Sequence, residues 1–446
     1  MHFPLPEELK KLASYFPRPL YIVGGYVRDV LCLRTPSDCD LAGDTDPSEV
    51  ERLLENSPFK VKKTSPKLMT LKIVSEKASY EYTAFRTDDY ETGHSPVSVR
   101  RTNDINADAS RRDFTANAVY LNILSGEICD PCHGCEDIKG RTLRQISEKT
   151  FTEDGLRLMR LCRQAAETGF DIDPATLSSA KKNAALIKEI SPERIRDELD
   201  RILVADCRYG TEKAHVRGLR LLDETGVLQY ILPEITLGKN LPQRADFHRY
   251  DVFGHILATL ENAAPKVRLA ALLHDVGKPY CYLKNGVYHG HDVEGERIAG
   301  DILNRLRYPK TVISETKKLV RLHMVDLKQE MRENKLRQFL QENYSLLPKL
   351  FLLKQADYSG TGLTEGTCPS VSRMKKTFAE MKEEHVPFSV KELAVNGRDL
   401  DFVPKEKRGL VLKALLRACA LKNADLNGKE KQLKYISNLL KENKNG

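Results

Sequence analysis

The stretch "GGYVRDVLCLRTPSDCDLA" at residues 24–42 begins with residue types that bind phosphate groups. Gly24 and Gly25 follow an apolar run that we interpret as a strand. At such a strand end, backbone amides can approach a phosphate because no Cβ stands in the way. Arg28, one turn into the helix expected to follow, would add a planar cation for triphosphate oxygens. A glycine pair alone is weak evidence, because glycine pairs end many strands.

Two aspartates in the same stretch have the spacing of a divalent-metal site. Asp38 and Asp40 alternate, so in a strand both carboxylates would point to one face. Such oxygen ligands suit Mg2+, which would also hold phosphates and activate an attacking hydroxyl. We expect Glu81, on a neighbouring predicted strand, to be the third acidic ligand. An Asp-x-Asp pattern alone more often marks an exposed loop, but the glycines and the arginine ahead of it favour the metal site.

A second set of residues with metal-binding chemistry lies between residues 250 and 360. An isolated histidine is more often a hydrogen-bonded core or surface residue than a ligand. The adjacent His-Asp pair in "ALLHDVGKP" changes this balance, because imidazoles with carboxylates suit Mn, Fe, Ni, Zn or Co, and a shared aspartate can bridge two ions. The candidate ligands of this divalent transition-metal site are His255, His274, Asp275, His291, His323 and Asp357.

The elements that must position these residues change in type along the chain. Apolar runs such as "LYIVGG", "LMTLKIV" and "YEYTAF" predict strands of a small mixed α/β domain. Apolar residues then recur at helical spacing, with a helix start at Ser191-Pro192-Glu193, and "NLPQRADFHRYD" is interpreted as a linker. We therefore expect an α/β domain over 1–125, a helical neck and body over 126–240, an all-α domain over 241–360 and a basic helical tail over 361–446.

Four ordered motifs, "GGYVRD", "DCDLA", "RRDFTANA" and "EDGLRLMR", resemble those of the class II tRNA nucleotidyltransferases, the CCA-adding enzymes and their bacterial poly(A) polymerase relatives. The resemblance covers roughly the first 200 residues. It implies addition of C, C and A to the 3′ end of tRNA from CTP and ATP. The tRNA 3′ oxygen would attack the α-phosphate, with Asp38 and Asp40 holding two Mg2+ ions.

The motif "EDGLRLMRLCR" offers a way to read a base without a template. Asp154, Arg157 and Arg160 step by three, so we expect them along one helical ridge, with Arg163 further on. A carboxylate can accept from an exocyclic amine while an arginine donates to the adjacent ring nitrogen, a pattern that cytosine and adenine share and uracil and guanine lack. The family resemblance assigns this role to Asp154 and Arg157. The alternative is an i,i+3 salt bridge on a solvent-facing helix.

Further nucleotide contacts are implied by the same resemblance. "RRDFTANA" carries over Arg112 and Asp113 as nucleotide-binding residues. The polar segment at 86–101 is expected to be poor in structure and resembles the flexible loop of enzymes that add the terminal A, which disfavours a CC-only enzyme. "SPERIRDEL", with Glu193, Arg194 and Glu198, is interpreted first as helix-capping structure.

The histidine and aspartate series resembles the HD-domain phosphohydrolases, whose chemistry is metal-assisted hydrolysis of phosphate esters. The resemblance implies a second activity on a 2′,3′-cyclic or terminal phosphate of damaged RNA, and "VNGRDL" resembles a C-terminal segment of HD-bearing members. Three alternatives stay open at this point. The chain could add only A or poly(A), could be a phosphohydrolase that uses its N-terminal half to bind RNA, or could be an inactive RNA-binding protein.

Composition narrows the class of protein. Hydrophobic residues make up 41% and charged residues 30%, and no apolar stretch approaches the roughly 20 residues of a membrane span, so we expect no membrane partner. The start "MHFPLPEELKKLASYF" lacks the features of a secretory signal, which points to the cytoplasm. The net charge of +8 is concentrated near the C-terminus and suits a polyanion such as tRNA. Cys129, Cys132 and Cys135 are spaced like zinc or iron–sulfur ligands, but ordinary turn cysteines are the simpler interpretation.

Overall fold

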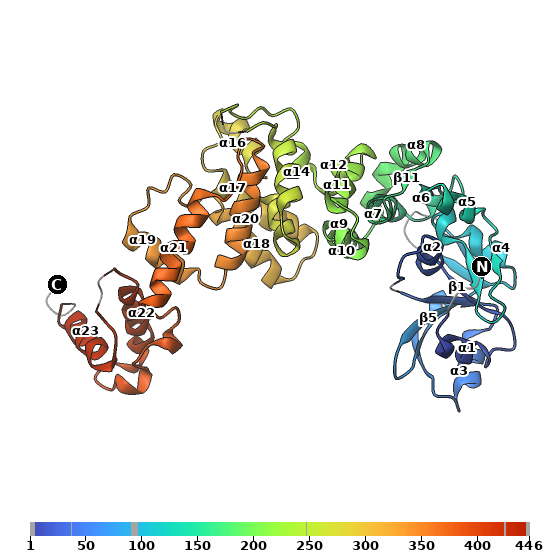
Figure 1. Ribbon diagram of the computed structural model, residues 1–446, viewed down its shortest axis with the longest axis horizontal. Coiled ribbons are helices and arrows are strands. Elements are labelled where there is room, and N and C mark those ends of the chain that lie inside the picture. Colours follow the sequence, from blue (N-terminus) through green and yellow to red (C-terminus); the bar gives the residue numbers. More distant parts are fainter. Residues whose placement is uncertain (1–4, 37, 91–96, 247, 423–424, 443–446) are drawn as a thin grey trace. The chain divides into compact units, whose positions relative to one another are not determined.

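The computed structural model describes residues 5–36, 38–90, 97–246, 248–422 and 425–442. The chain folds into two compact units. The first runs up to Thr236 and includes Arg305–Arg307, and the second comprises Leu237–Asn304 and the residues from Tyr308 onward. The expected order of an α/β part followed by helical parts is confirmed (Figure 1). Within the described residues, no helix has the length and apolar character needed to cross a membrane.

The first unit is built on a mixed seven-stranded sheet with the order β3-β4-β5-β2-β1-β8-β9 among the described residues. Its neighbours are antiparallel except for β2 and β5, which run parallel. Two further strand pairs lie outside this sheet. The strands are β1 Leu20–Val23, β2 Asp40–Gly43, β3 Lys60–Ser65, β4 Thr70–Val74, β5 Ser79–Ala84, β6 Arg86–Asp89, β7 Ser98–Arg101, β8 Tyr120–Asn122, β9 Ile128–Cys129, β10 Thr142–Leu143 and β11 Asp171–Ile172.

The register of the central strands places the predicted acidic residues next to the glycine pair. Val23, the last residue of β1, pairs with Asp40 at the start of β2. Asp40 in turn pairs with Glu81 on β5, so both carboxylates lie on one face of the sheet. Gly24 follows Val23 directly and has φ +83°, a backbone conformation that residues other than glycine rarely adopt.

Two expectations about this part of the chain are wrong in detail. Asp38 lies in the loop ahead of β2, so Asp38 and Asp40 do not alternate along one strand. The segment at 86–101 was expected to be poor in structure, but its two ends form a pair of strands. Strand β6 pairs with β7, with Arg86 opposite Arg101 and Asp89 opposite Ser98. Residues 91–96, the tip of the predicted flexible loop, lie outside the described residues.

The helices of the first unit lie against the sheet and then continue as a helical stack in which α7 packs on α9 and α11. Alternating apolar residues form a core under the sheet around Phe85 and Tyr120. The helices are α1 Glu7–Ala13, α2 Gly25–Leu31, α3 Pro47–Leu54, α4 Ile105–Ser110, α5 Gly134–Lys139, α6 Thr150–Glu153, α7 Arg157–Thr168, α8 Pro174–Asn183, α9 Pro192–Leu203, α10 Asp206–Tyr209, α11 Ala214–Glu224, α12 Leu228–Ile231 and α13 Pro233–Thr236, with 3-10 turns at Pro66–Leu68, Thr115–Asn117 and Ala184–Glu189.

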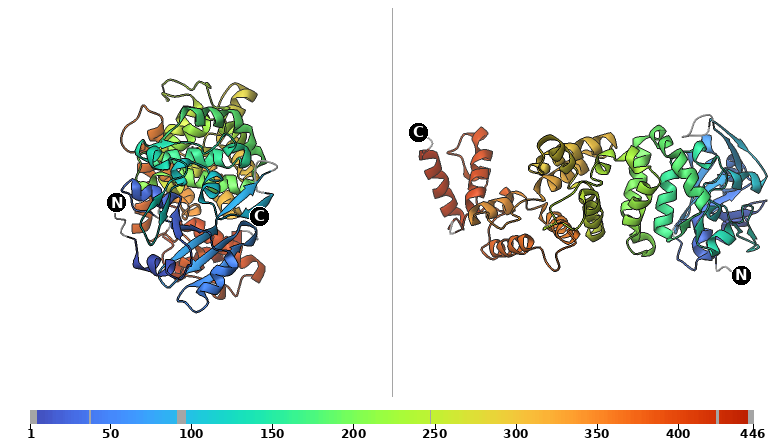
Figure 2. Two further views of the ribbon diagram at one scale, coloured as in Figure 1. Left: turned by 90° about the vertical axis from the view of Figure 1, so that its right-hand side faces the viewer. Right: turned by 90° about the horizontal axis from the view of Figure 1, so that it is seen from above.

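The second unit is helical throughout its described residues. Helix α14 packs along α20 (Figure 1), and the contacts along the chain place α15 on α18 and α20. Further along, α22 and α23 lie side by side (Figure 2) around a separate apolar cluster that includes Leu415 and Ile436. The helices are α14 Val252–Asn262, α15 Arg268–Leu273, α16 Lys278–Asn285, α17 His291–Arg305, α18 Lys310–Leu322, α19 Glu333–Glu342, α20 Leu347–Gly360, α21 Pro369–Glu383, α22 Arg408–Cys419 and α23 Lys429–Glu442, with 3-10 turns at Pro265–Val267, Val390–Glu392, Gly397–Asp399 and Lys405–Lys407.

Candidate functional site

A cavity of about 450 Å³ in the first unit gathers most of the residues that the sequence singled out. They come from the ends of β1 and β2, from α2 and from α7, which are far apart in the chain. Among the predicted residues, Gly24, Gly25, Arg28, Asp38, Asp40, Arg112, Asp113, Asp154, Arg157, Arg160 and Arg163 line this cavity. Glu81 does not line it but adjoins Asp40 through the strand register.

The acidic cluster of Asp38, Asp40 and Glu81 brings negative charges near Asp40. Desolvation and the neighbouring carboxylate of Glu81 raise the pKa of Asp40, and Asp38 adds to the effect. A carboxylate whose pKa is raised in this way is stabilised in the ionised form by a cation placed beside it. Across the residues that the structure describes, the three side chains are not among the groups whose ligand atoms lie within 4.8 Å of one another, but an oxygen-only donor set of this kind fits a hard divalent cation.

Arg28 is placed in the cavity but is already held by several partners. Its side chain is buried, and its guanidinium donates to Asp29, Asn117, Gln164 and the hydroxyl of Tyr209. These partners come from α2, the Thr115–Asn117 turn, α7 and α10. Arg28 therefore joins the sheet to the helical stack in addition to lining the cavity.

Buried Asp113 forms an ion pair with the partly exposed Arg160 in the cavity wall. Arg160 donates to Asp113 Oδ2 from Nη2 at 2.6 Å and from Nε at 2.9 Å, and Asn117 also donates to this carboxylate. Burial alone would raise the pKa of Asp113, but Arg160 and Asn117 outweigh it and lower that pKa well below its usual range. Asp113 is therefore ionised at neutral pH and fixes the orientation of Arg160.

Asp154 and Arg157 do not share a helical ridge, which corrects the sequence interpretation. Asp154 is extended, between α6 and α7, and Arg157 is the first residue of α7. Asp154 accepts from the Leu156 amide and pairs with Arg194 Nη2 at 2.7 Å. Arg157 donates to Glu153 and to the carbonyls of Thr150 and Arg111. The alternative from the sequence, an i,i+3 salt bridge between Asp154 and Arg157, is also absent, because each residue has other partners.

The "SPERIRDEL" segment contributes ion pairs rather than caps. Helix α9 does begin after Ser191, but the Ser191 side chain makes no capping hydrogen bond. Arg194 and Glu198 instead reach Asp154 and Arg163. Sequence reasoning gave no role in this cavity to Arg86, Asp88, Tyr90, Asn117, Gln164, Glu167 and Arg208. It assigned no nucleotide contact to Arg111 and Arg194, although both line the cavity.

Arg208 is the missed residue that lies nearest to the acidic cluster. Its Nη2 is 3.9 Å from Asp38 Oδ2, and its Nη1 is 3.6 Å from Glu167 Oε2. It is carried by α10, whose Tyr209 hydroxyl donates to Asp29 on α2. The only hint in the sequence is its place in "DCRYG", which resembles no motif.

We expect Arg163→Ala to act on stability first. Arg163 is buried and donates to two buried carboxylates, Glu198 at 2.6 Å and Glu167 at 2.8 Å. Removing the cation leaves the two carboxylates with longer contacts, from Arg201 to Glu198 at 3.7 Å and from Arg208 to Glu167 at 3.6 Å, at a cost of about 3 kcal/mol. Thermal unfolding followed by circular dichroism measures this. The control is Arg201→Ala, because Arg201 pairs with the same Glu198 but is 62% exposed, and it should cost less than about 1 kcal/mol. Equal midpoints for the two variants would contradict the structural role.

The second unit brings all six predicted transition-metal ligands together. They form two triads, His255–His274–Asp357 and Asp275–His291–His323, whose ligand atoms within each triad lie within 4.8 Å of one another. Asp275 faces both triads. Its Oδ2 is 3.2 Å from His274 Nε2 and its Oδ1 is 3.4 Å from His291 Nε2. This is the arrangement in which one carboxylate can bridge two ions.

Backbone carbonyls orient the four imidazoles of this cluster. The Nδ1 atoms of His255, His274, His291 and His323 contact the carbonyls of Gly360, Ala271, Tyr288 and Val320, respectively, at 2.6–3.1 Å. A carbonyl can only accept, so each Nδ1 donates its proton and each Nε2 is left with a lone pair, as in most metal-binding histidines. Gly277 allows this packing, because a Cβ there would lie 2.2 Å from the His291 carbonyl oxygen.

The charges of the cluster favour a cation. The Nε2 atoms of His255 and His274 lie 3.2 Å apart, and those of His291 and His323 lie 3.3 Å apart, so lone pairs would face each other if all four imidazoles were neutral. Burial alone would lower the pKa of His274, but Asp275 and Asp357 outweigh it and raise it to about 10, so these carboxylates favour a positive charge at this point, which a metal ion could supply instead of a proton. Burial lowers the pKa of His291 to about 4. The donor set of imidazoles and carboxylates therefore fits divalent transition metals.

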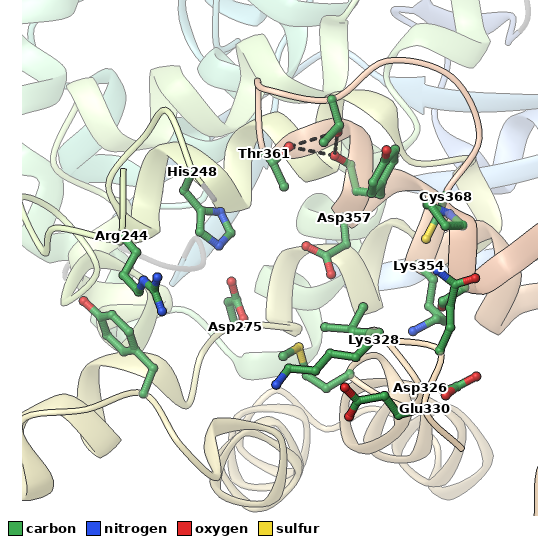
Figure 3. A pocket seen from close by; sticks show the side chains of 18 of the residues that line it. Arg244, His248, Asp275, Asp326, Lys328, Glu330, Lys354, Asp357, Thr361 and Cys368 are labelled. Atoms are coloured by element: carbon green, nitrogen blue, oxygen red, sulfur yellow. Dashed lines mark hydrogen bonds between the residues drawn. The ribbon is translucent and has the colours of Figure 1, made fainter. Parts of the chain in front are cut away.

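The two triads open into a cavity of about 1230 Å³ within the second unit. Figure 3 shows the carboxylates of Asp275 and Asp357 in its middle, with Arg244 on one side and Lys354 and Cys368 on the other. Lys278 Nζ lies 2.6 Å from Asp275 Oδ2. Side chains that bind phosphate thus surround the predicted ligands.

The three cysteines Cys129, Cys132 and Cys135 lie outside the two triads, which are the close ligand groups among the described residues. Cys129 and Cys132 pack against the core that contains Tyr120. Burial and a hydrogen bond to Asp130 raise the pKa of Cys135 to about 12.

Known protein families match three parts of the chain. The profile of the poly A polymerase head domain matches residues 20–144, that of the probable RNA- and SrmB-binding site of polymerase A matches 169–237, and that of the HD domain matches 252–359. The first and third of these contain the two clusters described above.

Whole-chain relatives agree with these matches. The chain is 32% identical to the A-adding tRNA nucleotidyltransferase of Deinococcus radiodurans, over 70% of this chain and 75% of the relative. It is 32% identical to the CC-adding tRNA nucleotidyltransferase of Thermus thermophilus, over 78% and 77%. The fold matches the crystal structure of the Bacillus stearothermophilus CCA-adding enzyme in complex with CTP, with a TM-score of 0.68 at 24% identity over the full length of both chains. The chain therefore belongs to the class II tRNA nucleotidyltransferase family, the CCA-adding enzymes and bacterial poly(A) polymerases, and it carries an HD domain.

Proposed function

We propose that this enzyme adds C, C and A to the 3′ end of tRNA from CTP and ATP. The observation that carries the proposal is one cavity that is lined by the Asp38 and Asp40 carboxylates and by Asp154 and Arg157, with Glu81 next to Asp40 in the strand register. The side of the cavity with the aspartates suits a triphosphate with its metal, and the side with Asp154 and Arg157 suits the edge of a base.

The roles of the residues follow from this geometry. Asp38 and Asp40, with Glu81 beside them, would hold two Mg2+ ions. When bound, Mg2+ would lower the pKa of the attacking 3′ hydroxyl and stabilise the departing pyrophosphate. The amides of Gly24 and Gly25 would approach the triphosphate, and Arg112 and Arg160 would supply positive charge. Asp113 holds Arg160 in the required orientation.

Base selection would rest on Asp154 and Arg157. The Asp154 carboxylate is oriented by the Leu156 amide and by Arg194, and Arg157 by Glu153 and two carbonyls. An acceptor and a donor fixed in this way match the amine and ring nitrogen of cytosine and of adenine. Uracil and guanine would place a carbonyl acceptor opposite the Asp154 carboxylate and an N–H donor opposite Arg157.

We expect Asp154→Ala to relax this selection. Loss of the acceptor removes the penalty against UTP and GTP, so discrimination should fall by about 1–3 kcal/mol, roughly five- to 150-fold. Single-nucleotide incorporation of each of the four triphosphates on one tRNA transcript measures it. The control is Asp223→Ala on α11, which does not line the cavity. Unchanged selectivity with normal folding would remove Asp154 from the base-reading role.

The product is decided by one extension experiment. Three tRNA transcripts, ending at the discriminator base, after one C and after CC, are supplied with CTP and ATP separately and together. Extension of all three to CCA supports the proposal. Growth of only the CC-ended transcript by one residue means a dedicated A-adding enzyme, and long A tails mean a poly(A) polymerase. Arg86, Asp88 and Tyr90 of the β6 hairpin border the cavity, in the position where the family's flexible loop would act.

The domain roles are part of the same proposal. Residues 1–125 would be catalytic, 126–240 would read the nucleotide and hold tRNA, 241–360 would form the HD domain, and 361–446 would be a basic tRNA-binding tail. The tail would contact phosphates without sequence preference, so affinity for tRNA should fall as salt rises.

We also propose a phosphohydrolase activity in the HD domain, because both triads are complete and face one bridging carboxylate. Bound transition-metal ions would polarise a phosphate ester and activate water. A 2′,3′-cyclic or terminal phosphate on damaged RNA is a suitable substrate, since its removal frees the 3′ hydroxyl needed for nucleotide addition. The test is turnover of a 2′,3′-cyclic nucleotide with added metals. Absence of turnover, with His274→Ala giving the same result, would reject it. Mg2+-dependent CTP incorporation would exclude the rival in which the N-terminal half only binds RNA.

A further inference from the structure

The N-terminus of α21 opens into the cavity that contains the HD triads. Cys368, Pro369 and Ser370 line this cavity, and α21 runs for 15 residues from Pro369. Its first backbone hydrogen bond of the i to i−4 type is Ser372 to Cys368, so the amides of Ser370 and Val371 precede the helical ladder. The side chain of Cys368 provides no capping bond. Helix N-termini with free amides and a positive dipole end attract anions.

Ser370 gives an independent indication of a ligand at this place. Its side chain is 1% exposed, and its Oγ has no hydrogen-bond partner in the structure. A buried hydroxyl without a partner is unfavourable, and donation to an anion at the helix end would satisfy it.

Three cations near this helix end lack carboxylate partners. Lys328, Arg332 and Lys335 line the cavity and are exposed, and none of them forms an ion pair with another described residue. The nearby acids are Asp326, which is paired with Arg373 at 2.8 Å, and Glu330. The wall beside the helix end is therefore positive overall and suited to phosphate oxygens.

Helix α20 connects this wall to the metal ligands. It carries Asp357 of the first triad, and its Lys354 donates to the carbonyls of His323 at 2.8 Å and of Val325 at 2.7 Å. Its Gln355 accepts from the Cys368 amide at 2.9 Å. Figure 3 shows Lys354 and Cys368 beside Asp357 in one continuous cavity. At about 1230 Å³ the cavity exceeds the roughly 300–1,000 Å³ of ordinary small-molecule pockets.

We propose that the N-terminus of α21, with Ser370, Arg332 and Lys335, is a second phosphate site of the HD domain. The cavity then takes two linked nucleotides of an RNA 3′ end. The terminal phosphate lies at the triads, and the preceding phosphodiester lies at α21. This proposal rests on the phosphohydrolase function proposed above and narrows its substrate from a single nucleotide to an RNA strand end.

Equilibrium binding separates the two phosphate sites. Isothermal titration calorimetry on the full chain measures the affinity for two ligands. One is a dinucleotide of two adenosines that are joined by a phosphodiester and end in a 3′-phosphate, and the other is adenosine 3′-monophosphate. The first ligand carries two phosphates and the second carries one. We expect the dinucleotide to bind about tenfold more tightly, as one charge-assisted contact allows. The double variant R332A/K335A should lose this preference, and Ser370→Ala should lose part of it, while both keep the affinity for the monophosphate within about twofold.

The control is Lys376→Ala, an exposed lysine on the same α21 that does not line the cavity. It should leave both affinities unchanged. Equal binding of the two ligands by the unmodified protein, or equal weakening of both by R332A/K335A, would overturn the second site. A separate hydrolysis assay keeps the two proposals apart. If neither ligand is cleaved with any metal but the dinucleotide preference remains and depends on Arg332 and Lys335, the phosphohydrolase function fails and the phosphate site stands.

Discussion

Asp38→Ala should abolish nucleotide addition while leaving the fold intact. The side chain is 81% exposed and lies in a loop, so its loss removes little packing. The substitution would remove one of the carboxylates that we propose to hold Mg2+ against the triphosphate. Metal stabilisation of transition-state charge is worth several kcal/mol, and about 4 kcal/mol corresponds to about a thousandfold in rate. We therefore expect kcat for CTP incorporation to fall by about 10³-fold or more.

The comparison for this variant is Glu55→Ala. Glu55 is an exposed acid that follows α3 in the same unit and does not line the cavity. It should retain full activity, and both variants should unfold at the same temperature as the unmodified protein. Normal incorporation by Asp38→Ala would reject the metal-binding role of this aspartate. Loss of activity by both variants would mean that acidic charge in general is needed.

Sequence spacing predicted which residues line the cavity of the first unit more accurately than it predicted their backbone conformations. The alternation in "DCDLA" predicted a strand through both aspartates, but β2 begins only at Asp40, its first residue paired with β1 and β5. Spacing by three predicted one helix through Asp154 and Arg157. The helix is interrupted between them: Asp154 is extended, and the next residue, Gly155, packs so closely on Leu186 that a Cβ would lie 2.8 Å from the Leu186 carbonyl oxygen. A tertiary contact of this kind leaves no period in the sequence.

Ion-pair partners were also beyond the sequence. Arg194 and Arg163 were identified, but their partnerships with Asp154 and Glu198 join segments about 35–40 residues apart. Arg208 was not identified, because nothing in the sequence distinguishes a single arginine in a short polar helix from the other arginines of the chain. Such pairings depend on how helices α7, α9 and α10 pack, and sequence spacing gives no information on that packing.

The HD ligands were predictable as a set because an adjacent His-Asp pair, followed at intervals by further ligands, is rare by chance. All six come together in the structure. The sequence did not reveal that the Nδ1 of each imidazole is held by a backbone carbonyl, nor that Asp275 divides its two oxygens between the triads. These features follow from the ends of α15 and α18 and the start of α17 meeting around α14 and α20.

Asp275→Asn should remove the phosphohydrolase activity proposed for the HD domain and leave nucleotide addition unchanged. The substitution keeps the shape of the side chain but removes its negative charge and turns one oxygen into an NH2 donor. That donor would face Nε2 lone pairs or a metal ion, and an amide bridges two cations poorly. Hydrolysis of a 2′,3′-cyclic phosphate should fall by about 10³-fold, which is the rate equivalent of about 4 kcal/mol of metal stabilisation.

Two measurements on Asp275→Asn make this prediction specific. Metal content after dialysis, measured by mass spectrometry, should fall together with hydrolysis, since the carboxylate contributes to both triads. Incorporation of CTP should stay at the level of the unmodified enzyme, because Asp275 lies outside the first unit and its cavity. The matched control is Asp301→Asn on α17, a 65% exposed aspartate paired only with Arg297 at 2.7 Å, and it should change neither quantity. If Asp275→Asn kept its metal and its hydrolysis, the bridging role would be wrong, and the two triads would act as independent sites.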